Sequence, residues 1–288
     1  MSDWSAWVGR ETNATDTLTP TAANRWLATF DRDLPNDGIM PQGVHFCLCT
    51  PDVATDTLGV DGHPARSAGS DGFLPPIPLP RRMWAASTIE FISPIAIGAA
   101  IERTSRIGSV SEKEGKSGSL AFVEIELLTM ADGCEAVREQ QTLVYRDAAA
   151  ANATLAPPPP KNARFDKSGW PVTRVITPST ALLFRYSALT FNTHRIHYDA
   201  PYARGVERYR GLVVHGPLIA SLLLQLAAKE LGENAVGQFT FRAISPAIAG
   251  ELLFLAMRPA ENDIDGGYEL GAFAQDGRQT MTASVVAR

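Results

Sequence analysis

The sequence predicts an α+β protein of two similar halves, each a curved antiparallel sheet wrapped around a helix, with the N-terminal copy degenerate. Three observations lead to this prediction. A proline-rich segment divides the chain near its middle, the two halves repeat one order of strands and turns, and one long apolar helix stands out in the second half.

The clearest break in the chain is AAAANATLAPPPPKNA, residues 148–163. Its four consecutive prolines cannot join a helix or a central strand, and they favour an extended spacer. We therefore expect an N-terminal domain of residues 1–147, a linker of residues 148–163 and a C-terminal domain of residues 164–288. Each of the two domains has an ordinary single-domain size.

The two halves share a pattern of strands and turns. IEFISPIAIG in the first half and FRAISPAIAG in the second both place an apolar strand before Ser-Pro and a glycine turn. Further on, LAFVEIELLTMADG leads into EAVREQQTLVYRD, and YELGAFAQDG leads into RQTMTASVVAR. Asp-Gly between two such strands is a strong hairpin signal. The common order favours a duplication over chance similarity.

The long helix is expected from Gly216 to a stop at Gly232, over GPLIASLLLQLAAKELG. A helix that is apolar on most faces should be buried. A curved antiparallel sheet wrapped around such a helix is the hot-dog architecture. In the first half the nearest helix candidate, PTAANRWLATFDR, lies far from the strands in sequence, which is why that copy is expected to be degenerate.

Composition excludes several classes of function. A net charge of −5 gives no electrostatic case for nucleic acid or an anionic membrane surface. The three cysteines form no framework and favour a reducing compartment. No signal peptide is visible, and the best apolar run, LIASLLLQLAA, is too short to span a bilayer. These features predict a cytoplasmic protein.

FNTHRIHYDAP, residues 191–201, gathers reactive side chains. His194 and His197 lie three residues apart, Asn192 precedes them, Asp199 follows, and His215 comes later in the chain. HxxH could place two imidazoles on one helix face with His215 as a third metal ligand. There is no HExxH and no acidic residue obviously placed to complete a site, so a metal site is disfavoured. A second alternative is that these histidines are hydrogen-bonded core residues.

His215 and Gly216 directly precede the long helix. The first N–H groups of a helix are free and carry partial positive charge, and glycine lets a ligand approach the backbone. Such a donor can hold the oxygen of a polarised thioester as it becomes an enolate. An imidazole upstream could then move protons at the adjacent carbons. These are the parts needed to add water across an α,β-unsaturated thioester.

RYSALTFNTHRIHYDAPYARGVERYRGLVVHGPLIASLLL resembles the hydratase motif of MaoC-like, (R)-specific enoyl-CoA hydratases. In that motif Phe-Ser-x-x-Thr-Gly-Asp-x-Asn-Pro-x-His is followed by a His-Gly helix start. PIPLPRRMWAASTIEF, EKEGKSGSLAFVEIE and REQQTLVYRD resemble the N-terminal half of double hot-dog acyl-CoA hydratases. The resemblance is greatest to itaconyl-CoA and mesaconyl-C4-CoA hydratases and to mitochondrial-type 3-hydroxyacyl-thioester dehydratases.

The resemblance implies roles for individual residues. His197 matches the catalytic histidine, and Gly216 matches the glycine whose N–H forms the oxyanion hole. Asn192 stands where the family has its catalytic aspartate, and His194 and Arg195 replace the motif's asparagine and proline. Because an amide cannot take a proton near neutral pH, we expect His197 to transfer protons and Asn192 to position water. His194, His215 and Asp199 are expected to support them.

The implied reaction is hydration of an α,β-unsaturated acyl-CoA of the itaconyl or mesaconyl-C4 type to citramalyl-CoA, reversible as dehydration, without a cofactor or metal. A second carboxylate on the acyl group would suit an arginine clamp. The candidates for substrate binding are Arg81, Arg82, Arg185, Arg195 and Arg204, with His45 and Trp84 in the acyl or pantetheine tunnel.

Three alternatives remain open. The first is a dehydratase of 3-hydroxyacyl chains on acyl carrier protein. The second is a hot-dog thioesterase, which needs a carboxylate to activate water, and Asp199 lies nearby in sequence. The third is a non-catalytic acyl-CoA sensor. The expected partner is an acyl-CoA, with no nucleic acid or membrane, and a homodimer is one assembly the sequence allows.

Overall fold

The computed structural model describes residues 3–66, 72–115, 118–161, 163–260 and 266–288. They contain a ten-stranded, wholly antiparallel sheet of order β1-β3-β4-β5-β2-β7-β10-β9-β8-β6. The first half contributes β1 (Glu11–Thr17), β2 (Arg81–Phe91), β3 (Ala100–Gly115), β4 (Gly118–Ala131) and β5 (Cys134–Arg146). The second half contributes β6 (Val172–Ile176), β7 (Val236–Ala243), β8 (Leu253–Pro259), β9 (Tyr268–Ala274) and β10 (Gln279–Ala287).

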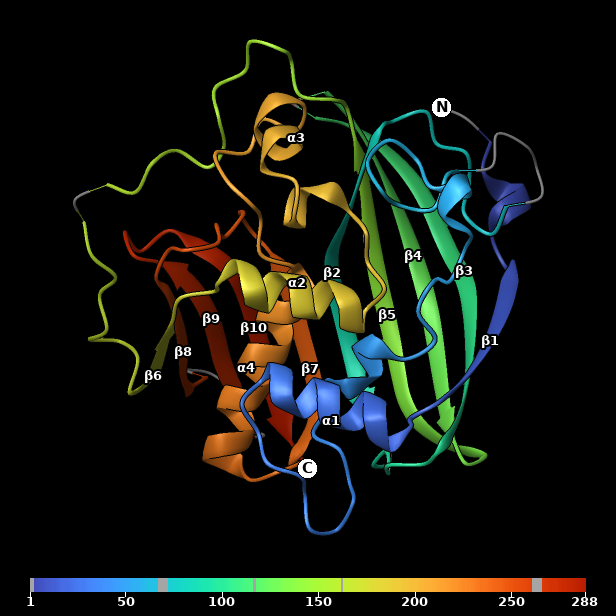
Figure 1. Ribbon diagram of the computed structural model, residues 1–288, viewed down its shortest axis with the longest axis vertical. Helices are drawn as coiled ribbons and strands as arrows, with labels where there is room; N and C mark the ends of the chain where they lie inside the picture. The colour runs from blue at the N-terminus through green and yellow to red at the C-terminus, as the bar shows by residue number, and fades with distance from the viewer. Residues whose placement is uncertain (1–2, 67–71, 116–117, 162, 261–265) are drawn as a thin grey trace.

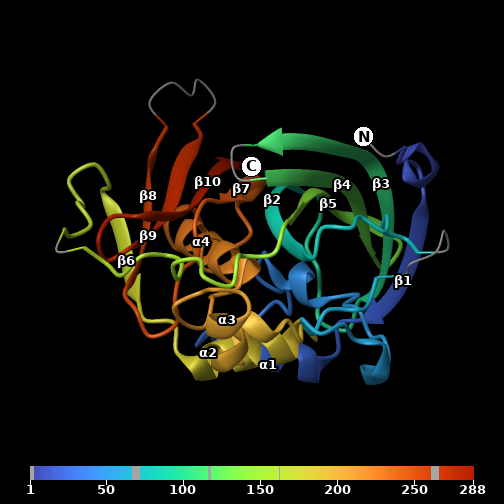
Figure 2. The same ribbon diagram turned by 90° about the horizontal axis from the view of Figure 1, so that it is seen from above.

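The sheets of the two halves join edge to edge. β2 pairs with β7 from Ala86↔Arg242 to Glu90↔Gln238, so the two predicted sheets are continuous with each other. Both sheets are curved, as the view from above shows, and the sheet of the second half curves around α4 (Figure 2). The α+β prediction with two curved antiparallel sheets is confirmed, and the join through β2 and β7 is an addition to it.

The predicted long helix is α4 (Gly216–Leu231), and Gly232 follows it with a φ of 109°. The sheet of the second half wraps around it, and α4 contacts β7, β8, β9 and β10 (Figure 1). Its middle is buried on every face, from Leu218 to Ala227. Each fully buried leucine stabilises the fold by about 2 kcal/mol. The predicted bounds and burial of this helix are confirmed.

The duplication is visible in matching turns. The Ser93 hydroxyl donates to the Glu135 carbonyl at 2.6 Å, and the Ser245 hydroxyl donates to the Gln279 carbonyl at 2.7 Å. The two helices α1 (Pro20–Thr29) and α2 (Thr180–Leu189) begin with equivalent caps and lie side by side (Figure 1). The first of them is the predicted PTAANRWLATFDR helix, whereas α2 was not predicted.

The first half has no counterpart of α4 among its described residues. In the second half the bridge Val213↔Ile248 leads directly into α4. The matching bridge in the first half, Ile39↔Ala96, leads only into the short 3-10 helix η2 (Val44–Cys47). The curved sheet of the first half therefore encloses space that a helix would otherwise fill. The remaining short elements are η1 (Ser5–Trp7), η3 (Thr55–Thr57), η4 (Arg195–His197) and α3 (Ala200–Gly205).

The proline-rich segment lies between β5 and β6. Its described residues form no helix or strand, but Ala156 donates its N–H to the Arg208 carbonyl at 2.8 Å, which fastens the segment beside α3. The division into domains at residues 1–147, 148–163 and 164–288 stays a prediction.

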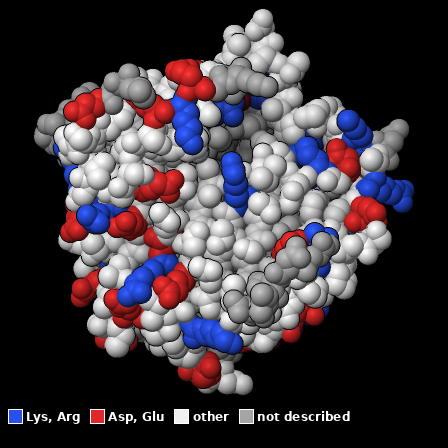
Figure 3. Space-filling model, turned by 180° about the vertical axis from the view of Figure 1, so that it is seen from behind, with Lys and Arg blue, Asp and Glu red and all other residues white. Residues whose placement is uncertain are grey.

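None of the described helices is long and apolar enough to cross a membrane. On the face seen from behind, acidic and basic side chains are interspersed around the edge, and one basic side chain stands near the middle of a largely uncharged centre (Figure 3). That face offers no broad basic surface of the kind that binds nucleic acid.

Candidate active site

A cavity of about 1170 Å³ lies between the two halves, where the first sheet lacks a long helix. Its walls combine first-half residues, among them His63, Arg82 and Trp84, with second-half residues. The second-half residues that matter below are Asn192, His194, His197, His215 and Gly216. The structure thus brings the predicted catalytic residues to one cavity.

His197 is held in one tautomer. Its Nδ1 lies 2.7 Å from the Val213 carbonyl oxygen and must donate to it, so Nε2 is the nitrogen that can accept a proton. Only 8% of the residue is exposed. Burial lowers the pKa of His197 to about 3, and the neighbouring His194 adds to the shift. A neutral imidazole with a free Nε2 can act as a general base.

His215 packs face to face on His197 at the start of α4. Their ring centroids are 3.6 Å apart and their planes differ by 16°. The His215 Nε2 lies 2.9 Å from the Ser187 hydroxyl on α2, which fixes the ring between the two helices. Its ring is 1% exposed, and burial lowers its pKa well below the ordinary value. His215 is therefore a neutral support for the His197 ring.

Gly216 is the first residue of α4 and lines the cavity. Within the described part of the chain its N–H has no hydrogen-bond acceptor. A Cβ built on Gly216 would approach only the Trp84 carbonyl oxygen, at 4.0 Å. The start of α4 is therefore open on this side, and its N–H can hold a ligand oxygen.

Asn192 opens the turn that carries the histidines. Its Oδ1 accepts the N–H of His194 at 2.9 Å, and its own N–H donates to the Ser187 carbonyl at 2.9 Å. The side-chain oxygen is thus already used within the turn, as is common for asparagine. The amide NH₂ is the part of Asn192 that can hold a water, and this role stays a prediction.

Asp199 has a structural role. It caps α3 by accepting the Tyr202 N–H at 3.0 Å, and its other oxygen lies 2.7 Å from the Arg195 guanidinium. The hydrogen bond from the Tyr202 backbone, followed by that from Arg195, lowers the pKa of the Asp199 carboxyl. Neither Asp199 nor Arg195 belongs to the cavity wall.

The five candidate arginines separate into two groups. Arg185, Arg195 and Arg204 lie outside the cavity wall. Arg185 donates to the Ala28 carbonyl and Arg204 to the Arg210 carbonyl. Arg81 and Arg82 line it. Arg81 is paired with Glu207, with Nε 2.5 Å from Oε2. Arg82 contacts no carboxylate among the described residues, so it is the candidate with a charge free for substrate.

His45 and Trp84 form a second polar wall in the first half. The His45 Nε2 lies 3.8 Å from Glu139, and the Ser87 hydroxyl donates to Glu139 at 2.6 Å and accepts from Trp84 Nε1 at 2.8 Å. Burial raises the pKa of Glu139 to about 7 and lowers that of His45 to about 3. Both side chains can therefore be neutral near pH 7.

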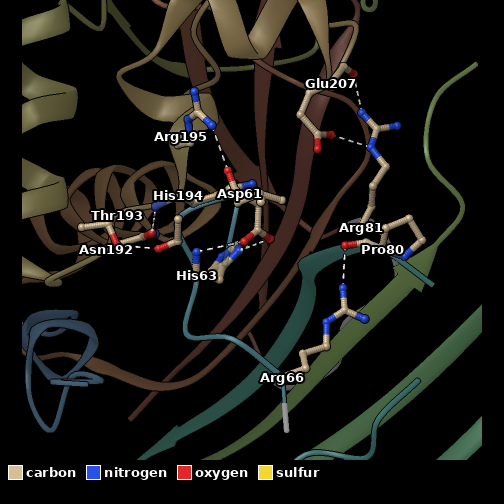
Figure 4. A network of polar contacts seen from close by, with 12 residues as sticks. Asp61, His63, Arg66, Pro80, Arg81, Asn192, Thr193, His194, Arg195 and Glu207 are labelled. Carbon is tan, nitrogen blue, oxygen red and sulfur yellow. Dashed lines mark hydrogen bonds and ion pairs between the residues drawn. The ribbon is translucent and has the colours of Figure 1, made fainter. Parts of the chain in front are cut away.

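Two site residues, Asp61 and His63, were missed in the sequence. Their loop docks against the catalytic turn, where the Asp61 carbonyl accepts the Arg195 N–H at 2.9 Å. The His63 Nδ1 lies 3.0 Å from Asp61 Oδ2, and its ring centroid is 4.1 Å from that of His194 (Figure 4). Burial alone would raise the pKa of Asp61, but the hydrogen bonds and charge of His63 lower it below its ordinary value.

Asp61, His63 and His194 each offer one atom to a group whose atoms all lie within 4.8 Å of one another, so these three residues have the chemistry and spacing to hold a metal ion. They differ from the His194, His197 and His215 set considered from the sequence. Nothing in the local sequence GVDGH distinguishes it from an ordinary turn, so no sequence signal indicated this group.

Comparison with known proteins identifies the family of this chain. The family model of hydroxyacyl-thioester dehydratase type 2 matches residues 43–249. The mesaconyl-C4-CoA hydratase of Chloroflexus aurantiacus is 38% identical over 290 residues, covering 99% of this chain and 98% of that protein. The mitochondrial hydroxyacyl-thioester dehydratase type 2 of Schizosaccharomyces pombe is 33% identical over 131 residues, 44% of this chain and 40% of its own length.

Solved structures confirm the fold. A MaoC-like dehydratase from Phytophthora capsici superposes with a TM-score of 0.73 at 12% identity, covering 100% of this chain and 99% of its own. A double hot-dog protein from Mycobacterium tuberculosis gives a TM-score of 0.60 at 12% identity, covering 98% and 96%. The family match spans most of the chain, and one relative aligns over nearly its full length. The chain belongs to the hydroxyacyl-thioester dehydratase type 2 family and has its double hot-dog fold.

Proposed function

We propose that the protein hydrates mesaconyl-C4-CoA, or a closely related unsaturated dicarboxylyl-CoA of the itaconyl type, to citramalyl-CoA, and that it catalyses the reverse dehydration. One observation carries the proposal: the neutral His197 ring stacks on the residue that directly precedes Gly216, whose N–H opens into the cavity. A base and an oxyanion donor thus share one wall. The mesaconyl-C4-CoA hydratase that is 38% identical supports the choice of substrate.

The reaction follows from this arrangement. The thioester carbonyl oxygen accepts the Gly216 N–H, which withdraws electron density from the β-carbon. His197 Nε2 takes one proton from water as the water oxygen bonds to the β-carbon, and the enolate forms on the Gly216 N–H. The α-carbon then receives a proton from His197, so that the sum is addition of one water. A single oxyanion donor of this kind contributes about 3 kcal/mol.

The second carboxylate of the proposed substrate would account for the basic side chains of the cavity. In mesaconyl-C4-CoA it is attached to the β-carbon, so it must lie close to the attacked atom and the histidines. Arg82 lines the same cavity and its charge acts on His63 and His194, which supports a contact between Arg82 and this carboxylate. Of the described lining residues only Glu139 and Glu207 are acidic, whereas Arg66, Arg81, Arg82, Arg103, Arg146 and Arg208 are basic. This excess of positive charge suits a carboxylate and the phosphates of CoA.

The position of the double bond favours mesaconyl-C4-CoA over itaconyl-CoA. In the first it is conjugated with the thioester, so an electron pair can move to the oxygen on Gly216 in one step. In the second it lies one bond further away, and a proton must shift before conjugate addition.

We also propose that the protein is cytoplasmic and forms a homodimer. Cell fractionation tests the location, and light scattering tests the assembly.

A second candidate is dehydration of longer 3-hydroxyacyl thioesters. It is favoured by the size of the cavity, about 1170 Å³, and by apolar lining residues that extend into the first half, among them Phe46, Leu127 and Leu143. A thioesterase would need a free carboxylate beside the carbonyl, and Asp199 is paired with Arg195 outside the cavity wall.

One experiment tests the proposal. The protein is incubated separately with mesaconyl-C4-CoA, itaconyl-CoA, crotonyl-CoA and a long-chain enoyl-CoA, and both enoyl-thioester absorbance and free thiol are followed. Loss of absorbance without thiol release, fastest with mesaconyl-C4-CoA, is expected. Thiol release would identify a thioesterase, and a preference for the long chain would favour the second candidate.

A further inference from the structure

We propose that Asp61 and His63, from the first half, complete the acid–base machinery as a carboxylate–imidazole pair. This pair holds His194 and stabilises the positive charge that forms when His197 takes a proton from water. The inference rests on the proposed function and adds two positioning residues to it. It makes the active site a composite of both halves of the chain.

The carboxylates that the second half places near the site are already paired with arginines, and Glu207, which lines the cavity, is paired with Arg81. Asn192 is an amide whose oxygen is bound within its own turn, and Asp199 is paired with Arg195 away from the cavity wall. An imidazolium formed at a residue that is 8% exposed is costly unless an anion compensates it. The site therefore needs a negative charge from another part of the chain.

The loop that carries Asp61 is built to reach the catalytic turn. Asp61 accepts the Arg195 N–H through its carbonyl, and the Thr193 hydroxyl donates to the Gly62 carbonyl at 2.5 Å. Gly62 has a φ of 86°, and a Cβ there would lie 1.9 Å from the Thr193 carbonyl oxygen. The two backbones thus touch at a position that only glycine can occupy.

The aromatic rings form a continuous row from this loop to the oxyanion donor. The centroid distances are 4.1 Å from His63 to His194, 5.5 Å from His194 to His197 and 3.6 Å from His197 to His215, which precedes Gly216. Figure 4 shows His63 joined to Asp61 by hydrogen bonds beside the turn that carries Asn192, Thr193 and His194. The rings of His63 and His194 therefore lie between the His197 ring, where the positive charge arises, and the Asp61 carboxylate.

His63 is oriented by the carboxylate. Its Nδ1 donates to Asp61 Oδ2 at 3.0 Å, and its backbone N–H donates to Asp61 Oδ1 at 3.1 Å. The charged or titratable groups that act on His63 are Asp61, Arg82 from β2 and Arg66, with His194 in ring contact. Asp61 is the anion among them, which makes it the partner of an imidazolium in this row.

The protons and electron pairs of the hydration step balance. His197 gains the proton that water loses, the C–O bond forms, and the electron pair of the double bond becomes the enolate. The imidazolium then gives its proton to the α-carbon, and the enolate pair forms the C–H bond. Asp61 and His63 exchange no atoms; they stabilise the intermediate imidazolium, and nothing is oxidised or reduced.

The test measures mesaconyl-C4-CoA hydration by Asp61→Asn and His63→Gln. The Asp61→Asn substitution keeps the shape and the backbone contacts of the loop while removing the charge. We expect kcat to fall about 10- to 100-fold with KM changed by less than about 3-fold, because the charge is needed only after proton transfer. Asp56→Asn, on the exposed neighbouring turn η3, is the matched control and should behave as the wild type.

A rescue variant separates electrostatics from a general structural effect. Asn192→Asp in the Asp61→Asn background returns a carboxylate to the histidine row, and kcat should recover about 10-fold. Unchanged kcat in Asp61→Asn, or no recovery in the double variant, would overturn the inference. So would activity that is lost on chelation and restored by Zn²⁺, because the group would then be a metal site. A wild-type protein that hydrates no enoyl-CoA overturns the proposed function as well.

Discussion

The ring of His197 lies 3.6 Å from the ring of His215 and nearly parallel to it, with a 16° angle between their planes. Because His215 caps α4, this stacking fixes the distance from the His197 Nε2 to the first N–H of the helix. The proposed base on η4 and the proposed oxyanion donor on α4 are therefore held in a fixed relative position by this ring contact. Rigid placement of both groups is what a proton transfer next to a developing enolate requires.

Removing the Gly216 N–H alone should disable the oxyanion hole. Gly216→Pro deletes the donor at a helix start, where proline is favoured, and His215 already has the extended backbone that precedes proline, with φ −60° and ψ 135°. Because Pro217 follows, circular dichroism must show that α4 still forms in this variant. Hydration should slow about 100-fold, and the melting temperature should stay close to that of the wild type.

Gly216→Ala is the control for this variant, since it keeps the N–H and its Cβ meets only the Trp84 carbonyl oxygen at 4.0 Å. It should lose less activity than Gly216→Pro. Equal losses in the two variants would show that cavity space, and not the N–H, is what matters at this position. Steady-state kinetics and circular dichroism measure both.

Arg82→Ala should separate dicarboxylic from monocarboxylic substrates. A charge-assisted contact with the second carboxylate is worth about 2 kcal/mol, so kcat/KM for mesaconyl-C4-CoA should fall about 30-fold. Crotonyl-CoA has no such carboxylate and should be affected far less. Arg185→Ala, outside the cavity wall, is the matched control. An equal fall for both substrates would assign Arg82 to CoA instead.

The rate should not follow the ordinary titration of histidine. Burial lowers the pKa of His197 to about 3, so the ring stays neutral and able to accept a proton far below pH 6.5. The kcat/KM for hydration should therefore be level from about pH 8 to about pH 5. An acid limb centred near 6.5 would contradict the buried, neutral His197.

Stability should depend on pH through His45. Its pKa is 6.5 in the unfolded chain and about 3 in the fold because of burial, so the unfolded state binds the proton first. The stabilisation is complete above pH 6.5 and is lost as the pH falls toward 3. At about pH 5 the loss is on the order of 2 kcal/mol.

Urea unfolding of the wild type and His45→Gln at two pH values measures this effect. The fall in the free energy of unfolding between about pH 7 and about pH 5 should be smaller in the variant by on the order of 2 kcal/mol. Equal falls in the two proteins would mean that His45 binds protons equally in the folded and unfolded states, so that burial does not lower its pKa.

Local patterns predicted a large part of this molecule. α4 follows from one apolar stretch with a glycine stop, and the hairpins β4–β5 and β9–β10 follow from Asp-Gly between strands. The His215–Gly216 junction was predicted because a helix start has a defined chemistry. These features depend only on residues close in sequence.

The elements that were missed depend on distant contacts. β1 is exposed along its whole length, and its sequence ETNATDT has no alternation of apolar residues that would predict a strand. It forms by pairing with β3. Asp61 and His63 reach His194 only because their loop docks on residues more than a hundred positions away. No periodicity or spacing within either segment encodes that approach.

Conversion of mesaconyl-C4-CoA in D₂O by the wild type and His197→Gln tests the central claim most directly. Proton NMR should show citramalyl-CoA with one deuterium on its α-carbon for the wild type, and a rate about 1,000-fold lower for the variant. Free CoA as the product, or equal rates in the two proteins, would contradict hydration by His197 at this site.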